Sequence, residues 1–168
     1  MAGASMQSYV IALGSNRRHA RHGSPAGVLR AACAAMEGEG LRIRTSSPVE
    51  ASTPLGPSRR RFANAAVLVE TRLSPPDVLS RLKAIEACFG RRPRGRRWGE
   101  RVLDLDIVLW SGGTWCTPHL RIPHPHFRER QFVLGPLAAI VPTWRDPLTG
   151  LAVRHLQARL TAPRPDLS

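Results

Sequence analysis

The feature that most constrains the fold is the order in which strand-like and helix-like apolar patterns follow one another. The patterned segments lie, in order, at residues 9–13, 24–38, 41–50, 62–73, 74–90 and 102–110. Apolar spacing indicates strands for the first, third, fourth and sixth segments and helices for the other two. The order strand–helix–strand–strand–helix–strand predicts an α+β domain of the ferredoxin-like βαββαβ type, with an antiparallel sheet and helices on one face.

Local signals support these helices and add a further one. Ser24 before a proline is typical of an N-cap, and Asp77 complements the N-terminal dipole of the second helix. A C-terminal addition to the core follows, with a helical piece expected at 132–141. We therefore expect a single domain over residues 1–168, with its core at about 8–142, a length suited to one hydrophobic core.

Charge is the unusual feature of the composition. The chain has 25 Lys and Arg residues against 12 Asp and Glu, a formal net charge of +13, and Lys83 is its only lysine. Arginine suits the planar recognition of phosphate and carboxylate groups. The excess favours an anionic partner, which could be a nucleotide, a nucleic acid or a membrane surface. Codon bias in a GC-rich genome explains part of the excess equally well.

The cysteines and the apolar runs indicate the cellular compartment in which the protein is expected. Cys33, Cys88 and Cys116 are odd in number and far apart, which argues against a disulfide framework or a structural zinc site. The longest apolar run near the N-terminus, 10–13, is too short for a signal sequence or a membrane span. We expect a cytoplasmic protein without a membrane partner.

The string Asp104-Leu105-Asp106 is the most informative for chemistry. Alternate side chains of a strand share a face, so both carboxylates should project from one side while Leu105 enters the core. Two adjacent carboxylates repel each other unless a cation lies between them, and hard oxygen ligands suit Mg²⁺. The alternative is an edge strand with a solvated acidic face.

Residues 91–101 precede the acidic pair and contain six arginines in eleven positions. Basic and acidic groups make joint sense around a metal-bound polyphosphate, because acids hold the cation and arginines neutralise the oxygens. We expect a mobile basic loop in which Trp98 stacks on a flat ring or lies against the phosphates. No P-loop or G-x-G-x-x-G motif offers another phosphate site.

Two further groups of residues are candidates for binding. His124 and His126, with Arg128 and Arg130, form a second polar cluster in which His124 could donate to a phosphate. The histidine pair could also bind a transition metal, but no third ligand has suitable spacing. Residues 52–57, together with Phe62 and Asn64, could form a slot for a flat heterocycle, with the amide offering both a donor and an acceptor. They could equally be an ordinary turn and strand start.

Taken together, these segments resemble the 6-hydroxymethyl-7,8-dihydropterin pyrophosphokinase family. The motifs that carry the resemblance appear in the family's order at 11–16, 54–56, 62–66, 85–86, 90–91, 97–99, 101–107, 122–125, Arg130 and Phe132. The string R-W-G-x-R-x-x-D-x-D-I at 97–107 is the most specific of them.

The resemblance implies a role for each matching position. Catalytic residues would be Arg91, Arg101, Asp104 and Asp106, of which the two aspartates bind the metal. ATP would contact Glu86, Arg97, Trp98, Ile107, His124 and Arg130. The pterin would be held by Ser52, Leu55 and Asn64, and between the rings of Phe62 and Phe132.

The reaction implied is transfer of diphosphate from ATP to the hydroxymethyl group of 6-hydroxymethyl-7,8-dihydropterin, a step of folate biosynthesis. The hydroxymethyl oxygen attacks the β-phosphorus and AMP leaves, with two Mg²⁺ ions as cofactor. The expected partners are these small-molecule substrates and no specific nucleic acid, and a monomer is expected. Departures from the family pattern at Glu50, Lys83, Pro93 and Glu100 affect the geometry of the loop rather than the class of reaction.

Two alternatives remain at the level of sequence. A basic nucleic-acid-binding module on the same scaffold would need exposed sheet aromatics, and the nine aromatic residues show no such motif. A catalytically inactive pterin- or nucleotide-binding relative is disfavoured by the presence of all four catalytic positions.

Overall fold

A computed structural model describes residues 3–16, 19, 21–52, 62–90 and 102–165. Its centre is an antiparallel five-stranded sheet in which β2, β4, β1 and β5 lie side by side in that order and β3 also pairs with β4. The strands are β1 (Gln7–Ser15), β2 (Arg42–Ser46), β3 (Glu50–Ser52), β4 (Phe62–Thr71) and β5 (Asp104–Trp110). The antiparallel sheet predicted from the sequence is confirmed.

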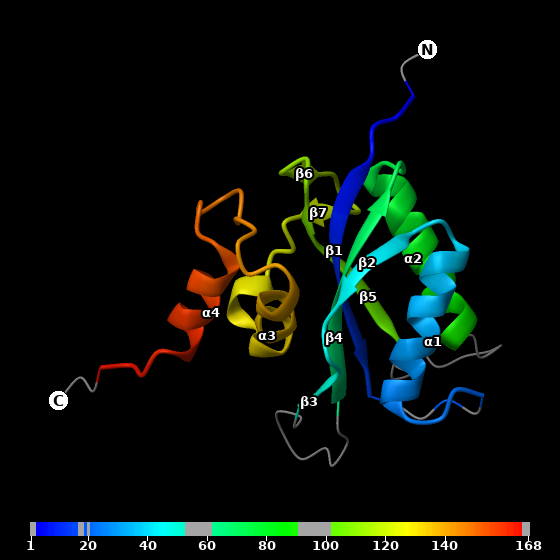
Figure 1. Ribbon diagram of the computed structural model, residues 1–168, viewed down its shortest axis with the longest axis horizontal. Coiled ribbons are helices and arrows are strands. Elements are labelled where there is room, and N and C mark those ends of the chain that lie inside the picture. Colours follow the sequence, from blue (N-terminus) through cyan, green and yellow to red (C-terminus); the bar gives the residue numbers. More distant parts are fainter. Residues whose placement is uncertain (1–2, 17–18, 20, 53–61, 91–101, 166–168) are drawn as a thin grey trace.

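Two helices cover one face of this sheet, α1 (Pro25–Gly38) and α2 (Pro75–Gly90) (Figure 1). The predicted N-cap of α1 is present, because Ser24 Oγ accepts a hydrogen bond from Gly27 N at 3.2 Å. Alternate strand residues such as Ile11 and Leu105 join both helices in a continuous apolar core. These two helices match the predicted positions.

Two more helices, α3 (Gln131–Ile140) and α4 (Val153–Thr161), lie on the opposite face (Figure 1). A second core there joins Val10 and Val108 of the sheet to Leu134 and Val153 of these helices. The expectation of helices on one face therefore accounts only for α1 and α2. The reason is that the central strands are apolar on both sides, so the second side also requires a cover.

The remaining elements are short. The 41–50 segment divides into β2 and β3 at Ser47, whose N–H donates to Ala66 O at 2.9 Å and whose Oγ accepts from Ala66 N at 2.9 Å. A small hairpin pairs β6 (Trp115–Cys116) with β7 (Arg121–Ile122), and a 3-10 turn, η1 (Phe127–Glu129), precedes α3. Within the described part of the chain, no helix is long and apolar enough to span a membrane.

Candidate functional site

The predicted acidic pair lies at the start of β5. Asp104 and Asp106 are exposed, whereas Leu105 and Ile107 are buried in the core against α1 and α2. This is the alternation expected of a strand with one face in the core, so both carboxylates project from the face that α3 and α4 cover. The prediction that the two aspartates share a face is confirmed.

Strand pairing places Asn64 in the same row as the first aspartate. Gly14 of β1 is paired with Asp104 on one side and with Asn64 on the other. Directly paired residues of antiparallel strands point to the same face, so Asp104, Gly14 and Asn64 form one line across the sheet. A Cβ at Gly14 would lie 3.5 Å from Asn64 Oδ1, so a larger side chain there would fill the space between the two polar groups.

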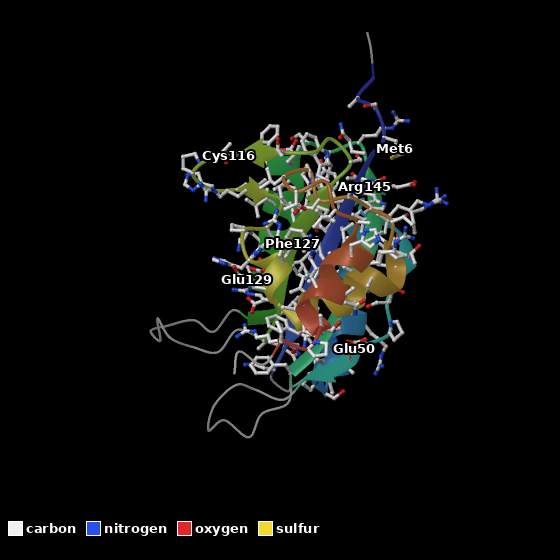
Figure 2. All side chains as sticks on the ribbon, turned by 90° about the vertical axis from the view of Figure 1, so that its left-hand side faces the viewer. Met6, Glu50, Cys116, Phe127, Glu129 and Arg145 are labelled. Carbon is white, nitrogen blue, oxygen red and sulfur yellow. The ribbon has the colours of Figure 1, made fainter. Side chains whose placement is uncertain are left out.

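The next row of paired residues also has a small residue at its centre. Ala12 of β1 pairs with Asp106 and with Ala66. Gly14 and Ala12 therefore form a strip of small residues between the two carboxylates and Asn64. Figure 2 shows that Glu50, which pairs with Asn64, lies at the end of the molecule opposite Met6 and Cys116. The polar row thus runs across one end of the sheet.

Aromatic residues border this end. Phe62, half-buried, begins β4 and by strand alternation faces the same side as Asn64. Phe132, 43% exposed, lies in the first turn of α3, which packs on that side against β4. The guanidinium carbon of Arg130 is 5.8 Å from the Phe132 ring centroid. Ser52 is the last residue of β3 and pairs with Phe62.

His124 is held beside the acidic pair by its backbone. Its N–H donates to Val108 O at 3.0 Å, and its Nδ1 accepts from His126 N at 3.1 Å. An accepting Nδ1 leaves the proton of the neutral ring on Nε2, which is then a donor. Burial lowers the pKa of His124, Asp106 opposes that shift, and Arg130 and His126 lower the pKa further. A neutral Nε2–H donor is therefore favoured.

The Arg128 side chain is not available to a ligand, because it is paired within the protein. Its guanidinium makes a two-point contact with Asp146, with Nε 2.5 Å from Oδ2 and Nη2 2.7 Å from Oδ1. Burial by itself raises the pKa of Asp146, but hydrogen bonds from Arg128, Thr149 and the Leu148 amide hold that pKa below its ordinary value. Sequence reasoning missed Asp146, because nothing in its neighbourhood signals a partner in η1.

Glu86 of α2 contacts the backbone of the acidic strand, and Ile107 is a buried residue of that strand. Glu86 Oε1 accepts from Leu105 N at 2.8 Å, so this carboxylate fixes the backbone between the two aspartates. The Ile107 side chain is 3% exposed in the core. Any contact that Ile107 makes with a ligand would therefore use its backbone.

A model of the family described as 7,8-dihydro-6-hydroxymethylpterin-pyrophosphokinase matches residues 10–142. The chain belongs to this family. The matched range begins in β1 and extends past α3, so it contains every site residue discussed above except Asp146 and its neighbours in the turn.

Known members of the pyrophosphokinase family are similar over most of this chain. A 2-amino-4-hydroxy-6-hydroxymethyldihydropteridine pyrophosphokinase of Pseudomonas aeruginosa is 40% identical over 159 residues, which is 94% of this chain and 92% of the relative. One of Haemophilus influenzae is 41% identical and covers 77% of this chain and 79% of the relative.

Solved structures show the same fold. The crystal structure of Plasmodium falciparum HPPK-DHPS matches with a TM-score of 0.73 at 14% identity. The match covers 95% of this chain but 44% of the Plasmodium chain, so the present chain corresponds to less than half of that protein. At this identity the likeness concerns the mixed α/β fold alone.

The structure brings together many of the residues that family resemblance selected. Those at or beside one end of the sheet are Ser52, Phe62, Asn64, Glu86, Asp104, Asp106, Ile107, His124, Arg130 and Phe132. Leu55, Arg91, Arg97, Trp98 and Arg101 lie outside the described residues.

The described residues supply few protein ligands for a metal ion. No group of three or more His, Cys, Asp or Glu side chains in this part of the chain could hold an ion. A pair of carboxylates such as Asp104 and Asp106 suits a cation that takes its remaining ligands from phosphates and water.

Proposed function

We propose that this protein transfers the diphosphate group of ATP to the hydroxymethyl group of 6-hydroxymethyl-7,8-dihydropterin, giving AMP and the pterin diphosphate for folate biosynthesis. The observation that carries the proposal is the row across the sheet from Asp104 over Gly14 to Asn64. It sets a carboxylate suited to a metal-bound phosphate beside an amide suited to the edge of a heterocycle, with a small residue between them. Membership of the pyrophosphokinase family supports the same conclusion.

We assign Mg²⁺ to Asp104 and Asp106, and propose two ions. Exposed carboxylates on a strand whose other face is anchored in the core are rigid, hard ligands. Bound Mg²⁺ would offset the charge of the phosphate oxygens. Glu86 contributes by holding the backbone at Leu105, so that the two carboxylates keep their spacing.

The pterin would occupy the strip beside Asn64. Asn64 is 6% exposed, and its amide would offer a donor and an acceptor to the polar edge of the ring, while Phe62 and Phe132 would supply stacking surfaces. Ser52 and Leu55 would contribute backbone contacts. Gly14 is small enough for the ring to lie close to the sheet, which would bring its hydroxymethyl group toward the aspartates.

The phosphates and the nucleotide would be held by donors on the other side of the pair. His124 presents Nε2–H, and Arg130 supplies a cation next to Phe132. Arg91, Arg97, Trp98 and Arg101 would add charge and a stacking ring, with Arg91 and Arg101 balancing the charge that develops on AMP as it leaves. Glu86 and the Ile107 backbone would border the nucleotide. These groups position and neutralise, so no covalent nucleophile is required.

The organisation of the chain fits one such unit. The strand order β2-β4-β1-β5 supports a ferredoxin-like core with C-terminal additions. We propose one domain over residues 1–168, acting as a monomer without a specific nucleic-acid partner. The three cysteines are all unpaired, which supports a reducing, cytoplasmic location.

The test is the production of AMP by the purified protein. We expect AMP from ATP only when the reduced pterin and Mg²⁺ are both present, and no AMP when either is omitted. ADP as the product, or AMP formed without the pterin, would contradict the proposed reaction. Binding of both substrates without any turnover would favour the inactive relative instead.

A further inference from the structure

Arg128 and Arg130 lie two positions apart but have different surroundings. Arg130 is half-buried, with its guanidinium beside Phe132 at the site. Arg128 turns instead to Asp146, to which its planar group donates two hydrogen bonds. This two-point geometry is specific to arginine. Arg128 is therefore committed to a partner within the protein, and the proposed function gives it no task.

Asp146 is enclosed and fully satisfied. Its side chain is 0% exposed, and it also accepts from Thr149 Oγ1 at 2.8 Å and from Leu148 N at 3.0 Å. The turn that carries Asp146 is closed by its own backbone, with Gly150 N donating to Asp146 O at 2.8 Å. A buried carboxylate that accepts four hydrogen bonds in a closed turn is rigid, and it can therefore hold another segment in place.

The 3-10 turn within the segment 124–130 has only long backbone hydrogen bonds. The donor–acceptor distances in its turn are 3.4 Å for Phe127 N to His124 O, 3.3 Å for Glu129 N to His126 O and 3.5 Å for Arg130 N to Phe127 O. These are long, as is common in a single 3-10 turn. The backbone anchors the two ends of the segment, where His124 N donates to Val108 O at 3.0 Å and Arg130 O accepts from Val133 N and Leu134 N. Two side chains anchor its middle, namely Phe127, 0% exposed in the second core, and Arg128 (Figure 2 labels Phe127 and Glu129).

We propose that Asp146 is a positioning residue that, through Arg128, holds His124 and Arg130 in place for the phosphates of ATP. The proposal rests on the proposed function for the identity of that ligand. Asp146 lies beyond residue 142, where the family match ends. A turn outside the matched range thus supports the nucleotide side of the site.

The effect on the two substrates should differ. His124 and Arg130 flank the tied turn and are assigned to the nucleotide. Asn64 and Phe62 belong to β4, and Phe132 belongs to α3, which packs against β4; none of the three takes part in the ion pair. Loss of the ion pair should therefore weaken the use of ATP and spare that of the pterin.

The experiment compares Asp146→Asn with the wild type in steady-state kinetics and in hydrogen exchange. We expect the KM for ATP to rise at least about fivefold while the KM for the pterin stays within about twofold. Backbone exchange over 124–130 should become faster, and exchange in α1 should not change. Equal changes in both KM values, or no change in the ATP KM of a folded variant, would overturn the proposal.

Two variants complete the design. Glu39→Gln removes an exposed ion pair with Arg81, 3.0 Å long, between α1 and α2, and should change neither KM nor exchange over 124–130. Arg128→Lys keeps the charge but loses the two-point contact, so it should give an intermediate ATP KM. If Asp146→Asn does not fold, Arg128→Lys is judged by the same criteria.

The failure of the proposed function would be visible separately. If the wild type makes no AMP, that function is wrong. The exchange comparison then decides the positioning claim, because unchanged exchange over 124–130 in both variants would refute it.

Discussion

The two faces of the central sheet are built from the same strands but differ in what they bury. The face toward α1 and α2 is apolar along most of its length, and Leu13 and Leu105, paired neighbours near the site end, are both buried there. The face toward α3 and α4 is apolar around Val10 and Val108 and becomes polar at Asp104 and Asn64. One face therefore supplies mainly stability, and the other provides both a core and a site.

The largest expected effect comes from removing the acidic end of the second face. Asp104→Ala or Asp106→Ala should lower turnover more than about a thousandfold, ~4 kcal/mol of transition-state stabilisation, because a metal ligand is lost. The unfolding midpoint should hardly change, since both side chains are exposed. Initial rates of AMP formation and thermal unfolding measure the two quantities.

A matched control lies on the same face of the sheet, far from the site. Glu70 in β4 faces the same side by strand alternation, but pairs with Ser8 at the opposite end of the sheet. Glu70→Ala should leave turnover within about twofold. More than about a tenth of wild-type activity in either aspartate variant would show that the metal assignment is wrong.

The second prediction concerns a core residue on the face that α1 and α2 cover. Leu29 of α1 is 1% exposed in the apolar core. Leu29→Ala should lower the free energy of unfolding by about 2–5 kcal/mol, through lost burial and the cavity that remains. The KM values of the folded protein should stay near those of the wild type. A large change in KM without a loss of stability would contradict the division between the faces.

The third effect concerns the polar group nearest the pterin. Asn64→Ala should weaken pterin binding by about 1–3 kcal/mol, because a polar edge of the ring is left unpaired. Nucleic-acid binding, which rests on counterion release and falls steeply with salt, should be untouched. Both affinities are measured by titration at low and near-physiological salt. Salt-resistant RNA binding without pterin binding would favour the nucleic-acid module.

The smallest expected effect is the pH dependence of the stability that Asp146 contributes. The folded-state pKa of Asp146 is lowered, so its stabilisation is complete above the unfolded value of about 3.9 and is lost as the pH falls through the folded pKa. The difference in unfolding free energy between wild type and Asp146→Asn should shrink below about pH 4, by at most ~1.4 kcal/mol per pH unit. Urea unfolding at several pH values measures it.

The purely apolar face provides the reference for this pH series. The difference between wild type and Leu29→Ala should not depend on pH, because no titrating group is removed. A constant difference for Asp146→Asn as well would mean that its ion pair adds no pH-dependent stability.

Much of the fold was predictable because local signals agree with it. The apolar spacing of α2, the cap at Ser24 and the alternation around Leu105 each depend on a few consecutive residues. The helices that cover the second face of the sheet were harder to predict from the sequence. Continuous apolar runs such as that in β4 do not say what packs on their second side, so α3 was predicted as a helix but not placed.

The site divides in the same way. Asp104 and Asp106 are recognisable from two positions in one strand, and the roles of His124 and Arg130 follow from family resemblance. The Arg128–Asp146 contact joins two loops separated by a helix, and neither residue has a distinctive neighbour. The residue pattern alone grouped Arg128 with Arg130, the resemblance assigned a role to Arg130 only, and the structure then placed the partner of Arg128.

The sequence by itself determined which residues alternate, where helices begin and which motifs resemble a family, because each depends on neighbours in the chain. Tertiary structure decided that Gly14 separates Asp104 from Asn64, and that a C-terminal turn holds Arg128. These relations arise from strand pairing and from the packing of α3 and α4 on the second face. They are long-range contacts, fixed only when distant segments bury their apolar sides together.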